Sequence, residues 1–133
     1  MGKLSPHFTE DEFRCKDGCG TCFVDQDFLF KLETARSFYR RWIPDGVFQI
    51  NSGCRCREHN ASVGGVDSSQ HLAVPEEDRK CNAADIKAAN GRERFYMMKA
   101  LFRAGFVGIG VADGYIHCDD GRYQPYRPSA WSY

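Results

Sequence analysis

The stretch that decides how this chain folds begins with Ser68-Ser-Gln-His-Leu-Ala73 and ends with Asn82-Ala-Ala-Asp-Ile86. A second segment near the C-terminus, Tyr115-Ile-His-Cys-Asp119, completes the pattern. Together they supply three side chains that commonly bind metal ions: His71, Asp85 and His117. Two neutral imidazoles and one carboxylate suit a zinc ion whose fourth position is open to water, whereas a structural zinc site usually takes four protein ligands. The set therefore predicts a catalytic metal centre.

The composition is that of one globular domain, residues 1–133, without a preference for a strongly charged partner. Hydrophobic residues make up 42% of the chain, and 18 Lys and Arg residues balance 18 Asp and Glu residues. No overall field therefore favours nucleic acid or a membrane surface. No apolar run approaches the length of a membrane span, and residues 1–7 lack the apolar core of a secretory signal. We expect a monomer made in the cytoplasm, without a nucleic-acid or membrane partner.

The hydrophobic pattern predicts an α+β domain, with helices packed against a small antiparallel sheet. Apolar stripes predict helices over residues 25–43 and 90–104, the second with its apolar face formed by Phe95, Met98, Leu101 and Phe102. Thr9 and Glu12 have the spacing of a capping box and predict a short helical turn. Strands are predicted over residues 47–52, 83–87, 107–111 and 115–118, the last two joined by the turn Asp113-Gly114.

Three segments lie outside the predicted core of long helices and sheet strands. Residues 1–24 form a Cys-rich N-terminal segment. Residues 74–82 are polar and charged, and are interpreted as an inserted surface loop. Residues 121–133 are aromatic and contain Pro, which indicates a C-terminal tail that packs across the body of the domain.

Seven cysteines are many for this length, and an odd number excludes complete internal pairing into disulfides. Cys15, Cys19 and Cys22 lie close together in a Gly-rich segment. This spacing is typical of half of a zinc-binding knuckle, which would need a fourth ligand from elsewhere in the chain. A second, structural metal, a group of buried thiols and a local disulfide are all compatible with the pattern.

Several blocks occur in a characteristic order. They are Ile50-Asn-Ser-Gly-Cys-Arg55, Glu58-His-Asn-Ala-Ser-Val-Gly-Gly65, Ser68-Ser-Gln-His71, Ala83-Ala-Asp-Ile86, Gly108-Ile-Gly110 and Tyr115-Ile-His-Cys-Asp119. In this order they resemble the zinc D-Ala-D-Ala carboxypeptidases and related phage endolysin peptidases, which share the hedgehog/DD-peptidase fold. The resemblance covers residues 5–120.

The resemblance implies a zinc-dependent hydrolysis of peptide bonds in bacterial peptidoglycan, as a carboxypeptidase or as an endolysin-type endopeptidase. It implies that the zinc ligands are His71, Asp85 and His117. Arg55 would grip a substrate carboxylate or stabilise charge on the scissile carbonyl, and Ser69 and Gln70 would line the cleft. A phage-type enzyme of this kind would act on the cell wall once released.

The sequence departs from the family pattern at the acid/base residue, which members commonly carry three positions before the last His. That position is Gly114 here. Asp113 is the first candidate for the general base and Asp119 the second, although Asp119 can instead support a ligand histidine. Asp85 also follows His71 by 14 positions, an unusually long interval that residues 74–82 explain as an insertion.

Two alternative functions therefore stay open. The first is a non-catalytic zinc-binding module of the same fold, which the glycine at position 114 favours. The second is a thiol-rich metal-binding protein whose functional site is the group Cys15, Cys19 and Cys22.

Overall fold

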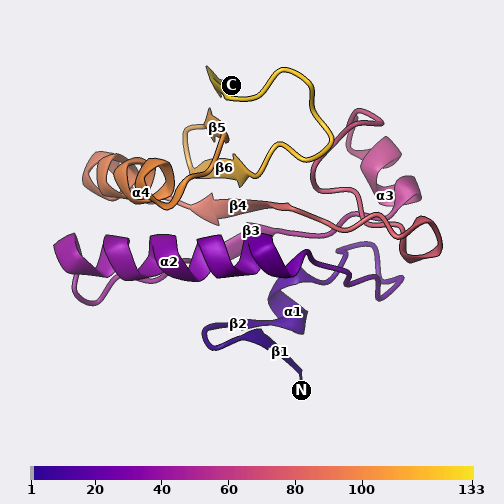
Figure 1. The fold of residues 1–133 in the computed structure, drawn as a ribbon, viewed down its shortest axis with the longest axis horizontal. Coiled ribbons are helices and arrows are strands. Elements are labelled where there is room, and N and C mark those ends of the chain that lie inside the picture. Colours follow the sequence, from indigo (N-terminus) through magenta and orange to yellow (C-terminus); the bar gives the residue numbers. More distant parts are fainter. Residues whose placement is uncertain (1) are drawn as a thin grey trace.

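A five-stranded sheet forms the centre of the computed structural model, which describes residues 2–133 (Figure 1). Its strands are β3 (Ile50–Ser52), β4 (Ala83–Lys87), β5 (Gly108–Val111), β6 (Tyr115–Asp119) and β7 (Ser129–Ser132). They lie in the order β3-β4-β6-β5-β7, and every pair is antiparallel except β5 and β7. In the middle of the sheet Asp85 on β4 pairs with His117 on β6. This register brings together two residues that are far apart in the sequence.

Two long helices, α2 (Gln26–Trp42) and α4 (Gly91–Ala104), pack against each other, and α4 also contacts β6. The predicted apolar stripe of α2 is confirmed, since its buried residues are Phe28, Leu29, Leu32, Ala35 and Tyr39. Each helix begins with a side-chain cap: the Asp25 carboxylate accepts from the Phe28 N–H, and the Asn90 amide oxygen accepts from the Glu93 N–H. Such caps satisfy backbone donors that the first helical turn leaves free.

The predicted apolar face of α4 was wrong in part. Met97, Ala100 and Leu101 are buried, whereas Phe95 and Phe102 are 61% and 52% exposed. Residues at positions i, i+3 and i+4 share one helix face, and the face centred on Met97 is the one that packs inward. Phe95 and Phe102, seven positions apart, lie together on the opposite, solvent-facing side of the helix.

The N-terminal segment consists of β1 (Lys3–Ser5), β2 (Phe8–Thr9) and α1 (Glu10–Phe13). The predicted capping box is present: the Thr9 side chain accepts from the Glu12 N–H, and the Glu12 carboxylate accepts from the Thr9 N–H. A series of edge-to-face aromatic contacts then runs from Phe8 through Phe13 and Phe28 to Phe106. These contacts fix the segment to α2 and to the sheet.

The inserted loop and the tail behave differently from each other. Residues 75–78, which include the 3₁₀ helix η1 (Pro75–Glu77), are exposed, but Cys81 and Asn82 are buried. The loop is thus exposed at residues 75–78, and the chain returns to the core just before β4. The C-terminal tail adds the strand β7, which the sequence did not predict. The predicted strand over residues 47–52 pairs only from Ile50, although burial alternates along residues 46–50.

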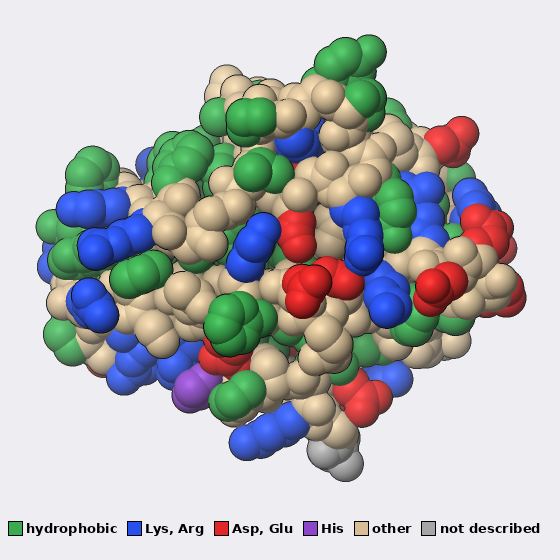
Figure 2. Space-filling model, viewed as in Figure 1, with side chains coloured by type: hydrophobic (Ala, Val, Ile, Leu, Met, Phe, Trp, Pro, Cys, Tyr) green, Lys and Arg blue, Asp and Glu red, His purple; other side chains and the backbone are tan. Residues whose placement is uncertain are grey.

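The surface carries both signs of charge. Figure 2 shows acidic and basic side chains interspersed over the centre of one face, with Lys and Arg side chains more frequent at the end where α2 and α4 lie. Within residues 2–133, no helix combines the length and the apolar character that crossing a membrane would require.

Candidate metal centre

His71, Asp85 and His117 form a compact triangle of ligand atoms. His71 Nε2 lies 3.2 Å from Asp85 Oδ1 and 3.3 Å from His117 Nδ1, and His117 Nδ1 lies 3.2 Å from Asp85 Oδ1. His71 comes from the loop before η1, Asp85 from β4 and His117 from β6. All three are buried. The long interval between His71 and Asp85 therefore leaves the two side chains in contact.

The outer nitrogen of each imidazole has a partner that can only accept a hydrogen bond. His71 Nδ1 lies 2.7 Å from the carbonyl oxygen of Gly53, and His117 Nε2 lies 2.6 Å from Asp119 Oδ2. Both outer nitrogens therefore carry the proton and donate it. A neutral imidazole then directs a lone pair into the triangle, where it faces a second lone pair and the Asp85 carboxylate.

This donor set fits a zinc ion. Three acceptors that face one another within 3.3 Å repel each other unless a cation or a proton lies between them. Nitrogen and oxygen ligands at zinc bond lengths of about 2.0–2.2 Å lie roughly 3.3 Å apart at tetrahedral angles. The separations in the triangle match this spacing, and three protein ligands leave one position open.

Burial and hydrogen bonds set the charge of each ligand. Burial lowers the pKa of His71, so its imidazole is neutral near pH 7. Burial alone would raise the pKa of Asp85, but the neighbouring His117 and His71, which donate to its carboxylate when their inner nitrogens are protonated, outweigh burial and lower that pKa. Burial likewise would lower the pKa of His117, yet its bonds to Asp119 and Asp85 prevail and raise it. A proton on His117 Nδ1 therefore competes with a metal ion for this site.

Asp119 supports the ring of His117, and its carboxylate oxygens are both already hydrogen-bonded. Its side chain is fully buried, and besides His117 it accepts from Arg127 Nε at 3.1 Å and from another Arg127 nitrogen at 2.8 Å. The close packing needs a glycine on the neighbouring strand, because a Cβ at Gly108 would lie 2.3 Å from Asp119 Oδ1. A carboxylate that holds a ligand histidine in this way fixes its ring and its tautomer.

A cavity of about 500 Å³ opens over the triangle. The predicted substrate-binding residues Arg55, Ser69 and Gln70 all line it. A terminal nitrogen of Arg55 lies 3.9 Å from Asp85 Oδ2, so a guanidinium stands beside the ligand carboxylate. The opposite wall carries aromatic side chains, and the Trp131 ring lies 5.3 Å from the His117 ring.

Sequence reasoning missed the loop residues 63–66, which line the cavity, and a larger group from the C-terminal tail and the adjoining strands. The members of this larger group are Tyr115, Gln124, Arg127, Trp131 and Tyr133, which all line the cavity. The aromatic content of residues 121–133 was the available signal. It indicated packing across the body but could not identify the surface that the tail covers.

The two candidates for the general base take positions that do not match that role. Asp113 is exposed on the turn between β5 and β6 and is absent from the cavity wall, while its carbonyl oxygen accepts from Arg94. Asp119 is engaged by His117 and Arg127. Asp113 lies outside because Asp113-Gly114 forms the tip of a hairpin, which points away from the sheet centre. In the part of the chain that the structure describes, no free carboxylate lines the cavity.

The cysteines gather differently from the expected group Cys15, Cys19 and Cys22. Cys15 and Cys19 are joined by Asp17 and by Cys56, which lies 41 positions after Cys15. Cys22 lies elsewhere, and its thiol donates to the carbonyl oxygen of Glu10. None of the seven cysteines forms a disulfide.

Comparison with known proteins assigns the chain to a family. No curated protein matches the sequence. A family model described as Peptidase M15 matches residues 6–119, which is most of the chain. The matched range contains every residue of the metal triangle, together with Arg55 and the supporting Asp119. The α+β fold agrees with this match, and the chain belongs to the peptidase M15 family.

Proposed function

We propose that this protein is a zinc-dependent peptidase that hydrolyses stem peptides or crosslinks of bacterial peptidoglycan. The observation that carries the proposal is the triangle of His71, Asp85 and His117, in which both imidazoles direct lone pairs at one point beside an ionised carboxylate. The family match supports a peptidase. The peptidoglycan substrate follows from the resemblance to D-Ala-D-Ala carboxypeptidases and phage endolysins, and the enzyme would meet it at the cell wall after release.

His71, Asp85 and His117 would hold the zinc ion, with Asp119 and Arg127 keeping the His117 ring in place. A zinc ion bound there would supply a Lewis acid and would lower the pKa of a water molecule in its open position. The carboxylate of Asp85 and the two neutral imidazoles keep the net charge of such a centre positive. Positive charge at this point favours the negative charge that develops on a scissile carbonyl.

Arg55 is the cation best placed to bind the substrate. Its backbone is held on both sides, since Arg55 N–H donates to the His71 carbonyl and Ala73 N–H donates to the Arg55 carbonyl, each at 2.8 Å. The guanidinium is thereby kept in the cavity beside the metal triangle. A planar guanidinium offers two parallel donors to a carboxylate. Arg55 would accordingly bind the terminal carboxylate of a stem peptide or steady the developing oxyanion.

The aromatic wall suits a peptide with small apolar side chains. Trp131 stands on β7, Tyr133 directly follows that strand and Tyr115 is on β6, with 5.6 Å between the Tyr115 and Tyr133 rings. Their rings offer apolar surface, while the hydroxyl groups can bond to backbone amides of a substrate. A D-alanyl methyl group would find an apolar contact here.

A non-catalytic zinc-binding module of the same fold is the second candidate. The observation in its favour is that both described carboxylates of the cavity wall, Asp85 and Asp119, are already engaged. A peptidase of this arrangement must pass the proton of the attacking water to a neutral group or to solvent. A binding module needs no such step.

Digestion of purified peptidoglycan, followed by mass spectrometry, tests the proposal. The zinc-loaded protein is compared with a chelator-treated sample and with the variant His117→Ala. Release of free D-alanine only by the zinc-loaded wild type would establish a carboxypeptidase, and release of longer peptides an endopeptidase. Intact peptidoglycan from several wall types, with zinc still bound, would reject hydrolysis in favour of the binding module.

A further inference from the structure

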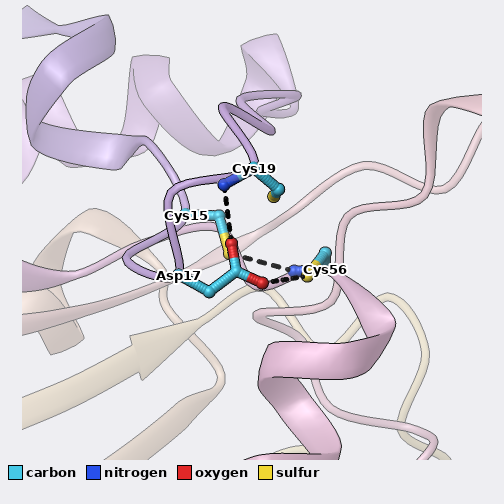
Figure 3. A group of neighbouring side chains, drawn as sticks. All are labelled: Cys15, Asp17, Cys19 and Cys56. Carbon is cyan, nitrogen blue, oxygen red and sulfur yellow. Dashed lines mark hydrogen bonds between the residues drawn. The ribbon is translucent and has the colours of Figure 1, made fainter.

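A second group of ligand-type side chains lies outside the cavity, where the N-terminal loop meets the start of α3 (Arg57–Ser62). Figure 3 shows Cys15, Cys19 and Cys56 around the carboxylate of Asp17. The ligand atoms of all four residues lie within 4.8 Å of one another. Cys15 and Cys56 are buried, whereas Asp17 and Cys19 are exposed. The group thus closes a loop against the body of the domain.

Hydrogen bonds join the side chains of Cys15, Asp17 and Cys56, and Cys19 is tied to the same carboxylate through its backbone. The thiols of Cys15 and Cys56 donate to the two oxygens of Asp17, at 3.3 Å and 2.9 Å. The backbone N–H of Cys19 donates to the same carboxylate at 2.9 Å. Asp17 is therefore ionised, and these bonds to Cys19 and Cys56 lower its pKa. Two thiol protons occupy the place that a cation would take.

The sulfur atoms also receive hydrogen bonds from the backbone. Cys56 N–H donates to Cys15 Sγ and His59 N–H donates to Cys56 Sγ, both at 3.4 Å. The second bond caps α3, so the Cys56 sulfur lies at the N-terminal end of that helix. These donors point at the sulfur atoms that a metal ion would bind, while burial raises the pKa of both thiols, so the sulfurs of the metal-free protein keep their protons.

We propose that Cys15, Asp17, Cys19 and Cys56 bind a structural zinc ion. Three thiolates and one carboxylate complete a four-coordinate site with no open position, which is the pattern of a structural centre. Sulfur atoms on zinc at bonds of about 2.3 Å lie roughly 3.8 Å apart, so small side-chain rotations suffice to close the observed group. Binding releases the three thiol protons to solvent and forms three zinc–sulfur bonds and one zinc–oxygen bond.

The site would join two segments that lie far apart in the sequence. Cys15, Asp17 and Cys19 belong to the N-terminal loop, and Cys56 directly follows Arg55, the cation of the cavity. A metal ion here closes a long chain loop and so restricts the unfolded chain. It would also anchor the residue next to Arg55. The proposal does not depend on the peptidase function.

Cobalt substitution distinguishes this site from the histidine triangle, because only a thiolate ligand gives a strong near-ultraviolet charge-transfer band with Co²⁺. The reduced, metal-free protein is titrated with Co²⁺ under a non-thiol reductant. We expect one equivalent of thiolate-bound cobalt in the wild type and in His117→Ala. We expect Cys19→Ser to weaken this binding by more than the roughly 10–100-fold that loss of a merely supporting residue costs.

Cys22→Ser is the matched control, since Cys22 lies in the same segment but outside the group. It should keep the band at full strength. Because Cys19 is exposed, its replacement by Ser should leave the fold intact, which circular dichroism checks. No band in the wild type, or equal loss in Cys19→Ser and Cys22→Ser, would overturn the proposal.

Thermal unfolding gives a second measurement, which does not depend on the cobalt charge-transfer band. In the His117→Ala background, which removes a ligand of the histidine triangle, chelator should lower the melting temperature of the zinc-loaded protein. The double variant His117→Ala/Cys19→Ser should melt at the same temperature with and without chelator. A chelator effect of equal size in both variants would contradict a zinc ion at the cysteine group.

Discussion

The histidine triangle and the cysteine group are both clusters of metal-ligand side chains, but the chain holds them in opposite ways. Asp85 and His117 stand opposite each other on the adjacent strands β4 and β6, and Asp119 with Arg127 supports the ring of His117. The cysteine group lies at the surface, and three of its four members share one short loop. The triangle opens onto a cavity, whereas the cysteine group has a full set of four ligands.

Position in the fold, in addition to ligand chemistry, thus separates a site for reactions from a site for stability. Ligands on paired strands keep their geometry without the metal ion, because the sheet hydrogen bonds hold the backbone. Ligands on a loop depend on the metal ion itself to order them. Variants of the two groups should therefore affect different properties.

Removal of a triangle ligand should have the largest effect. His117→Ala takes away one of three ligands and leaves the Asp119–Arg127 pair without its imidazole. We expect peptide hydrolysis to fall to the level of the chelator-treated protein, with the melting temperature changed far less than the activity. Hydrolysis assays and zinc analysis by mass spectrometry measure both. Full activity in His117→Ala would remove the triangle from the mechanism.

Loss of the supporting carboxylate should have an intermediate effect. Asp119→Asn preserves the shape of the side chain but removes the negative charge that holds His117 Nε2–H and pairs with Arg127. We expect zinc affinity to fall roughly 10–100-fold, as is typical for supporting residues. Competition with a chromogenic chelator measures it. An unchanged affinity would mean that the ring of His117 is held by its surroundings alone.

Replacement of the cavity cation should affect substrate binding more than metal binding. Arg55→Lys keeps the charge but loses the paired donors, so we expect kcat/KM to fall about 10-fold, equivalent to about 1.4 kcal/mol. Zinc content should stay at the wild-type level. A fall in zinc content would instead assign Arg55 to the upkeep of the triangle, through its neighbour Asp85.

Acid should weaken zinc binding gradually at the triangle. The pKa of His117 is raised above its ordinary value of 6.5 by Asp119 and Asp85, despite burial. A proton therefore competes with zinc at a higher pH than it would at an ordinary imidazole, and affinity should fall as the pH is lowered through the range above and around 6.5. Zinc titrations of the Cys19→Ser variant isolate this site. A flat profile would show that His117 is neutral throughout this range.

The smallest effect is expected on the turn between β5 and β6. Asp113→Ala changes an exposed side chain that does not reach the cavity. We expect hydrolysis to stay within about 2-fold of the wild type, less than about 0.4 kcal/mol. Steady-state kinetics on a stem peptide checks this, and a large loss would restore Asp113 as a proton acceptor after movement of the turn.

Local patterns in the sequence predicted the elements that bear the site. The strand Ala83–Lys87 has the predicted bounds. The helix Gln26–Trp42 begins and ends within one residue of the predicted range, 25–43. The strand is a short apolar run and the helix is a capped amphipathic stripe, and both patterns are strong predictors of structure. The blocks around His71, Asp85 and His117 then located the triangle.

Contacts between distant segments were beyond such reasoning. Strand β7 has four residues, Ser129–Ser132, and forms only because it pairs in parallel with β5. Arg127 and Trp131 therefore could not be assigned to the cavity. Cys56 was missed as a neighbour of Cys15 for the same reason, since 41 positions separate them. Asp113 was chosen for its place in the sequence, although Asp-Gly is also a hairpin turn signal.

Anomalous X-ray diffraction from zinc-soaked crystals, recorded above and below the zinc absorption edge, tests the central claim most directly. The account predicts one peak about 2.0–2.2 Å from His71 Nε2, His117 Nδ1 and an Asp85 oxygen. A second peak is predicted among Cys15, Asp17, Cys19 and Cys56, independently of the first. A triangle without a peak in fully soaked crystals at neutral pH would contradict the account of this protein as a zinc peptidase.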